Sequence, residues 1–88
     1  MSGKISDNIA EIMASLGSSM QVFTITHLPQ VAAKGDHHFK VEKKIEGDKS
    51  LTKLNYLNPK QRIDEIAMML SGNKITDTAI AHAKQLMN

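Results

Sequence analysis

The sequence contains no cysteine and no tryptophan, and its aromatic side chains are limited to Phe23, Phe39 and Tyr56. The lack of cysteine excludes disulfides, thiolate metal ligands and a cysteine nucleophile, and it fits the reducing cytosol. No apolar run approaches the roughly 18 residues of a membrane span, and no charged start followed by an apolar core marks a signal peptide. These absences predict a soluble, cytoplasmic protein without membrane partners.

Charge of either sign is not concentrated anywhere in the chain. There are 11 Lys and Arg residues against 9 Asp and Glu residues, for a formal net charge of +2, and they interleave without a basic block. Nucleic-acid-binding modules more often combine a Lys/Arg cluster with stacking aromatics, so this pattern argues against direct DNA binding by the segment. With 88 residues, 41% of them hydrophobic, we expect one small globular domain (1–88) with a thin core.

The first part of the chain changes from a helical to a strand-like pattern. Apolar residues recur at spacings of three and four within 5–16, which predicts an amphipathic helix that Gly17 ends. Residues 21–26 then form a short, β-branched, mostly apolar run that is typical of a strand buried on both faces. Such a strand needs neighbours on both edges, and we expect them to lie upstream of Met1.

A turn and a hairpin are predicted next. Pro29 can start a short helical turn, and Gly35 can stop it. Alternating apolar and charged residues in 38–45, a second run at 50–57 and the connection 46–49 together predict an antiparallel hairpin with a solvated face.

Two helices are predicted to complete the chain. Asn58 reads as an N-cap with Pro59 at the first helical position, and Gln61 can reach back to the cap. Gly72 closes this helix, and Thr76 caps the last one. The predicted apolar faces comprise Ile63, Ile66, Ala67 and Leu70 in the first helix and Ala79, Ile80, Ala83, Leu86 and Met87 in the second.

His27 is the first candidate functional residue, because it directly follows the predicted strand. In open α/β sheets, ligands bind at the carboxyl ends of the strands. An imidazole held there by the Leu28-Pro29 step can donate a hydrogen bond to a phosphate oxygen. Strand-end histidines are also commonly satisfied by local backbone, so position alone leaves a structural role for His27 open.

The string around His27 carries a more specific signal. Ile25-Thr26-His27-Leu28-Pro29-Gln30-Val31-Ala32-Ala33 resembles the histidine switch loop of the RecN family, relatives of the structural-maintenance-of-chromosomes (SMC) proteins among the ABC-type ATPases. The likeness covers nearly the whole chain and continues through Gly35, His38, Val41, Arg62, Glu65-Ile66-Ala67, Met69-Leu70, Gly72, Ile75-Thr76 and His82-Ala83.

The resemblance implies an α/β fold, the C-terminal part of an ABC/SMC-type ATPase head. This would be a partial P-loop NTPase lobe with one buried strand, an antiparallel hairpin and flanking helices. It implies that His27 is a catalytic switch histidine, which senses the γ-phosphate and helps position the attacking water when two heads clamp ATP. Ser2 and Gly3 stand where the family's D-loop ends, although such a pair is also common at flexible termini. With His27 and Gln30 they are the implied nucleotide contacts.

The activity implied for the intact protein is ATP-driven, SMC-like action at DNA double-strand breaks, with ATP and Mg²⁺ as cofactors. The implied partners are the missing N-terminal lobe of the same head, a second head in a homodimer, and DNA through the full-length protein. The sequence holds no Gly-x-x-x-x-Gly-Lys-Ser/Thr phosphate loop, no Walker B carboxylates and no ABC signature segment. We therefore expect this segment alone to be catalytically inactive and to bind no nucleotide.

The sequence also allows other interpretations. The main alternative is a stand-alone α+β module that binds a protein partner, in which His27 is only structural. An independent hydrolase lacks a Gly-x-Ser-x-Gly elbow. Adjacent His37 and His38 would point to opposite faces of a strand, so we expect no metal site.

The methionines Met68, Met69 and Met87 have two possible roles. They either fill the core or form a patch that packs on the absent lobe.

Overall fold

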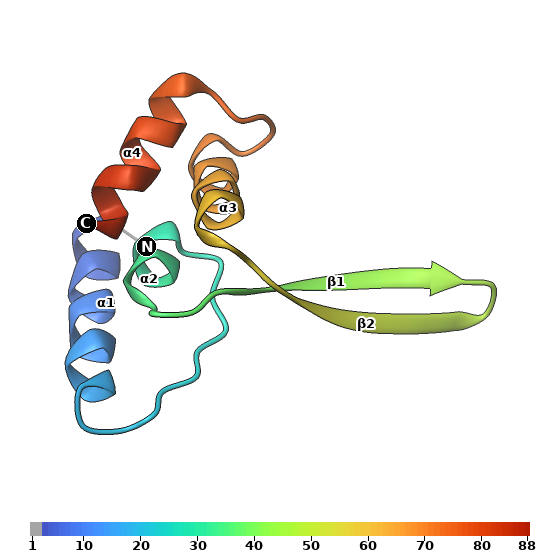
Figure 1. Ribbon diagram of the computed structural model, residues 1–88, viewed down its shortest axis with the longest axis horizontal. Coiled ribbons are helices and arrows are strands. Elements are labelled where there is room, and N and C mark those ends of the chain that lie inside the picture. The colour runs from blue at the N-terminus through green and yellow to red at the C-terminus, as the bar shows by residue number, and fades with distance from the viewer. Residues whose placement is uncertain (1–2) are drawn as a thin grey trace.

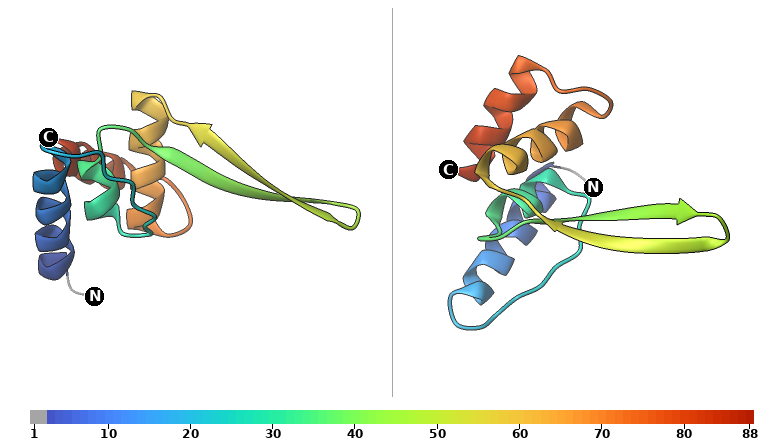
Figure 2. Two further views of the ribbon diagram at one scale, coloured as in Figure 1. Left: turned by 90° about the horizontal axis from the view of Figure 1, so that it is seen from below. Right: turned by 45° about the vertical axis from the view of Figure 1, so that its right-hand side comes forward.

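The computed structural model describes residues 3–88, in which the helices gather at one end and a β-hairpin extends away from them (Figure 1). In chain order the elements are α1 (Gly3–Gly17), α2 (Pro29–Lys34), β1 (Phe39–Glu46), β2 (Lys49–Tyr56), α3 (Pro59–Ser71) and α4 (Asp77–Met87). The other views show the same projecting hairpin (Figure 2). The Cα radius of gyration is 14.2 Å. A compact chain of this length has about 12 Å, and the hairpin accounts for the difference.

The hydrophobic core lies among α2, α3 and α4. Ile66 and Ala67 on α3 are fully buried. Because most of the other buried residues are alanines, the core is as thin as the length of the chain predicts. The predicted apolar faces of the two C-terminal helices are confirmed. The buried cluster is Ala33, Ile66, Ala67, Ala79 and Ala83, with Ala32, Ile63, Leu70, Ile80, Leu86 and Met87 packed against it.

Helices α3 and α4 begin at the predicted capping residues. The Asn58 side chain accepts a hydrogen bond from the Gln61 backbone N–H at 2.8 Å, and the Gln61 side chain accepts one from the Asn58 N–H at 3.0 Å. These two bonds complete a capping box. The Thr76 hydroxyl accepts from the N–H of Ala79 at 3.1 Å. Helix α3 ends at Gly72, whose φ of +90° is rare for residues with a side chain.

Strands β1 and β2 form the predicted antiparallel hairpin, from Phe39 opposite Tyr56 to Glu46 opposite Lys49. Residues that face each other across the ladder point to the same side, so the hairpin has one mainly apolar and one mainly charged face. The large apolar side chains of the hairpin are 50–81% exposed, so both faces are solvated and not only the charged one. The apolar face carries Phe39, Val41, Lys43, Ile45, Leu54 and Tyr56, and the charged face carries Lys40, Glu42, Lys44, Glu46, Lys49, Leu51 and Lys53.

Helix α1 forms as predicted, but much of its apolar stripe is exposed. Its buried residues are Ser6 and Ala10, whereas Ile5 is 51% and Ile12 61% exposed. The helix packs against α2, which has only six residues and covers little surface. The apolar periodicity therefore predicted the helix correctly, but it did not predict which side of α1 packs against α2.

The predicted strand at 21–26 does not form in the described part of the chain. The segment is irregular, and its apolar side chains face solvent, with Phe23 83% and Ile25 99% exposed. Among residues 3–88 the sheet contains only β1 and β2, so no strand is paired with this segment. A strand needs partners for its backbone N–H and C=O groups, which β-branched side chains cannot replace. The prediction of a buried strand is therefore wrong for this chain.

Candidate functional site

The connection that leads into α2 is shaped by Thr26 and Pro29. The N–H of Leu28 donates to the Thr26 hydroxyl at 2.9 Å, and the Leu28 carbonyl accepts from the N–H of Ala32 at 3.0 Å. Pro29 begins the helix, where its missing N–H costs no hydrogen bond. These contacts fix the backbone on both sides of His27 and confirm the predicted helical turn.

The predicted site residues are partly brought together. The His27 side chain is exposed and makes no hydrogen bond or ion pair within residues 3–88. Gln30 is half-buried beside the start of α1: a Cβ on Gly3 would lie 3.8 Å from Gln30 Nε2. The structure therefore joins Gly3 and Gln30 but bonds neither to His27. Ser2 lies outside the described residues.

Gln30 also lines a small cavity between α1, α2 and α4. The cavity has a volume of about 190 Å³. Small-molecule sites usually occupy roughly 300–1,000 Å³, so this cavity is too small to enclose a nucleotide. Its lining residues are Asp7, Glu11, Gln30, Lys34, Gln85 and Leu86.

The other end of α2 is held by Arg62 on α3. Its Nη2 donates to the carbonyl oxygens of Ala32 at 3.0 Å and Ala33 at 3.1 Å, and also to that of Gly35. A cationic donor here satisfies carbonyl groups that have no partner within the helix. Burial lowers the pKa of Arg62, and the charge of Asp36 opposes that shift. Nothing in the local spacing singles out Arg62, because its partners lie 27–30 residues earlier.

His38 lies at the hairpin base, close enough to this arginine to feel its charge. Its Nδ1 is buried without a hydrogen-bond partner in the described residues, as is Nε of Arg62. Burial lowers the pKa of His38, the charge of Arg62 lowers it further, and Glu65 acts in the opposite direction. The His38 carbonyl accepts from the N–H of Leu57 at 2.9 Å, which extends the hairpin ladder by one pair.

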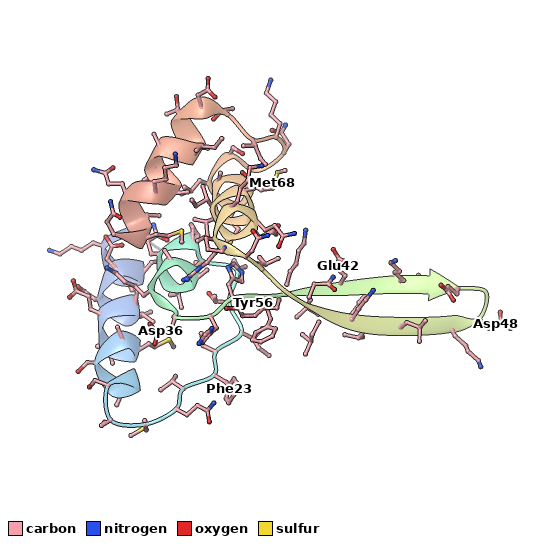
Figure 3. The ribbon with its side chains drawn as sticks, viewed as in Figure 1. Phe23, Asp36, Glu42, Asp48, Tyr56 and Met68 are labelled. Atoms are coloured by element: carbon pink, nitrogen blue, oxygen red, sulfur yellow. The ribbon has the colours of Figure 1, made fainter. Side chains whose placement is uncertain are left out.

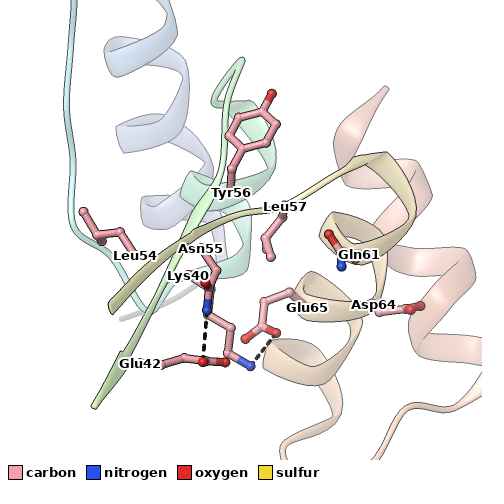
Figure 4. Close-up of a pocket in the computed structure, with 9 residues that line it drawn as sticks. All are labelled: Lys40, Glu42, Leu54, Asn55, Tyr56, Leu57, Gln61, Asp64 and Glu65. Carbon is pink, nitrogen blue, oxygen red and sulfur yellow. Dashed lines mark hydrogen bonds and ion pairs between the residues drawn. The ribbon is translucent and has the colours of Figure 1, made fainter. Parts of the chain in front are cut away.

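A cleft of about 540 Å³ separates the hairpin base from α3 (Figure 4). Lys40 spans it, with its Nζ 3.1 Å from a carboxylate oxygen of Glu65. Asn55 donates to Glu42 at 3.0 Å on the same face. Tyr56 on β2 lies at the hairpin base, whereas Glu42 on β1 lies farther toward the hairpin turn (Figure 3). This cleft is lined by charges of both signs, and Lys40 and Glu65 are paired across it.

The histidines do not converge. His37 Nδ1 shares a hydrogen bond of 2.9 Å with the Tyr56 hydroxyl, whereas His82 lies exposed on α4. Within residues 3–88 no group of three or more His, Cys, Asp or Glu side chains is arranged to hold a metal ion. No helix in the same range is long and apolar enough to cross a membrane.

The sequence of this mixed α/β chain was compared with those of known proteins. No family model matches the chain. The DNA repair protein RecN of Deinococcus radiodurans is 40% identical over 79 residues, which cover 90% of this chain and 14% of that relative. RecN of Haemophilus influenzae is 36% identical over 88 residues, covering 100% of this chain and 16% of the relative. RecN of Bacillus subtilis is 36% identical over 87 residues, covering 99% and 15%.

The class that these matches define is a group of proteins named for DNA repair. The chain belongs to the RecN family, and it spans 14–16% of the length of the three relatives.

Proposed function

We propose that this chain is the C-terminal segment of the ATPase head of a RecN protein, and that His27 is its switch histidine for ATP binding and hydrolysis in double-strand-break repair. Matches to RecN proteins over 90–100% of the chain support this assignment. The observation that carries it is the position of His27, an exposed imidazole two residues before α2 that makes no hydrogen bond or ion pair within residues 3–88.

The chemistry of the imidazole suits contact with a terminal phosphate. Phosphoryl transfer depends mainly on positioning and electrostatic stabilisation, which an N–H donor supplies. Because His27 has no partner within residues 3–88, it can donate to a phosphate oxygen without breaking an existing bond. Gln30, with no side chain on neighbouring Gly3 to obstruct it, is a second candidate donor.

The segment fits only part of a nucleotide site. ATP with Mg²⁺ would supply the γ-phosphoryl group, and His27 and Gln30 would contact its phosphate end. The small cavity beside Gln30 and the lack of a Gly-rich phosphate loop in the sequence support a site completed by the missing N-terminal lobe. The chain would then be a partial P-loop NTPase lobe of an SMC-like, cytoplasmic protein. A second head would cover the nucleotide, and DNA would bind through the full-length protein.

The test uses a RecN relative in which this segment replaces the corresponding residues, such as the Deinococcus radiodurans protein. His27→Ala should lower ATP turnover by at least about tenfold, because removal of one charge-stabilising donor has costs of this order or larger. Circular dichroism should show unchanged folding. His82→Ala, which removes an exposed histidine from α4, is the matched control and should retain turnover. Equal turnover in the His27 variant and the control would refute the switch role.

The alternative is a protein-interaction module without a nucleotide role. The exposed apolar face of the hairpin, with Ile45 81% exposed, is the observation that favours it. Under this alternative His27→Ala would leave ATP turnover intact, so the same experiment separates the two functions.

A further inference from the structure

The outer edge of β1 presents unpaired backbone groups in a regular pattern. The N–H of Leu57 donates to the carbonyl of His38, so these two residues form a hydrogen-bonded pair. Hydrogen-bonded and non-bonded pairs alternate along an antiparallel ladder. The even-numbered residues of β1 therefore bond to β2, while the backbone groups of Val41, Lys43 and Ile45 point to the outer edge.

No described element covers that edge. The backbone of β1 runs beside β2 and beside no other helix or strand of residues 3–88. The hairpin extends away from the helices in every view (Figures 1 and 2). A bare edge of this kind is a template for pairing with another strand.

The sequence of β1 is complementary to itself when a second copy lies antiparallel with Lys43 at the two-fold axis. Val41 then faces Ile45 of the second copy, and Glu42 faces Lys44 of the second copy. Opposite charges and apolar pairs across neighbouring strands stabilise a sheet. The only like-charged pair is Lys43 with its own copy, and its flexible side chains can diverge into solvent.

Other registers lack this complementarity. A shift of two residues in one direction places Glu42 opposite its own copy, and a shift in the other direction places it opposite Glu46. Both arrangements oppose like charges, which destabilises the pairing. A shift of one residue would place apolar side chains of one copy on the charged side of the other.

We propose that this chain self-associates through the outer edges of β1, so that two hairpins form one four-stranded antiparallel sheet. The pairing places the two apolar faces side by side on one surface, which increases the apolar area buried between neighbouring side chains. The proposal does not depend on a nucleotide role for His27.

The first test is sedimentation of the 88-residue chain over a concentration series. We expect a mass of at least two chains at high concentration and of one chain at low concentration. Val41→Pro removes an N–H that points to the outer edge and is not used by β2, a position where an edge strand tolerates proline. It should weaken association by at least about tenfold, because Val41 lies next to the centre of the proposed ladder.

A charge variant tests the register. Lys44→Glu places two carboxylates opposite each other twice per dimer and should weaken association by about fivefold. Lys74→Glu makes the same change in net charge at an exposed residue between α3 and α4, and it should have little effect. Equal effects of the two variants would overturn the proposed register.

Amide hydrogen exchange tests the proposed pairing of β1 edges in the unsubstituted chain. This test does not depend on whether a variant folds. With rising concentration, the N–H groups of Val41, Lys43 and Ile45 should gain protection, whereas those of the even-numbered residues should be protected throughout. A chain that stays monomeric at millimolar concentration would overturn the proposal. So would association without this alternating pattern.

Discussion

Arg62 on α3 joins that helix to the carbonyl end of α2 through its side-chain hydrogen bonds. The substitution Arg62→Met keeps an unbranched aliphatic stem and removes the guanidinium group, with its charge and all of its N–H donors. It leaves the carbonyl groups of Ala32, Ala33 and Gly35 without their shared donor. The helix that follows His27 would then lose its anchor at the carbonyl end.

The size of the loss follows from these contacts. A hydrogen bond from a charged donor contributes about 1.5–3 kcal/mol net. Because a single nitrogen serves the three carbonyls at a half-buried position, we count the set as one to two such bonds, or about 3 kcal/mol. A chain of this length has a free energy of unfolding of roughly 4–13 kcal/mol, so the loss is a large fraction of the total.

The measurement is urea unfolding followed by far-ultraviolet circular dichroism, with a thermal melt as a second readout. We expect the melting temperature to fall by at least about 10 °C, since each kcal/mol shifts it by about 4–8 °C in a small domain. Lys60→Met is the matched control, because Lys60 is 90% exposed and 3.9 Å from Asp64. That exposed pair should contribute little. A loss below about 0.5 kcal/mol in the Arg62 variant would refute the anchoring role.

Two further predictions concern the core and the hairpin base. Ile66→Ala should lower the free energy of unfolding by about 3 kcal/mol, because Ile66 is the largest fully buried hydrophobic residue in the described core. Urea unfolding checks this, and a loss under about 1 kcal/mol would mean that the site collapses around the smaller side chain. Because the pKa of His38 is lowered on folding, the unfolded chain binds more protons below the ordinary histidine pKa of about 6.5. Stability should therefore fall as the pH drops through that value, less so in His38→Gln; equal pH dependence in both proteins would contradict this role.

The elements that were predicted correctly are those whose signals are local. The Asn58 cap lies three residues from Gln61, and Gly47 supplies the positive φ that the hairpin turn needs. Such contacts depend on neighbours in the sequence, so spacing alone locates them. The apolar faces of α3 and α4 were predictable for the same reason, since a helix places residues three and four apart on one side.

The features that were missed depend on partners far along the chain or outside it. Residues 21–26 have the composition of a strand, but strand formation requires backbone partners that this chain does not supply. Arg62 gained its role only when folding brought it to the end of α2. His27 was identified from its place in the chain and from a family resemblance, and its role as a switch is still a prediction.

The central proposal, that His27 senses the γ-phosphate, is tested most directly by the imidazole resonances of His27 in a RecN relative that carries this segment. Nuclear magnetic resonance spectra would be recorded for the ADP-bound protein and for the protein bound to a nonhydrolysable ATP analogue, each with Mg²⁺, and then compared. The two ligands differ chiefly at the γ-phosphate, so we expect a saturable shift with the analogue and a much smaller one with ADP. Identical spectra in the two nucleotide-bound states would contradict the proposal.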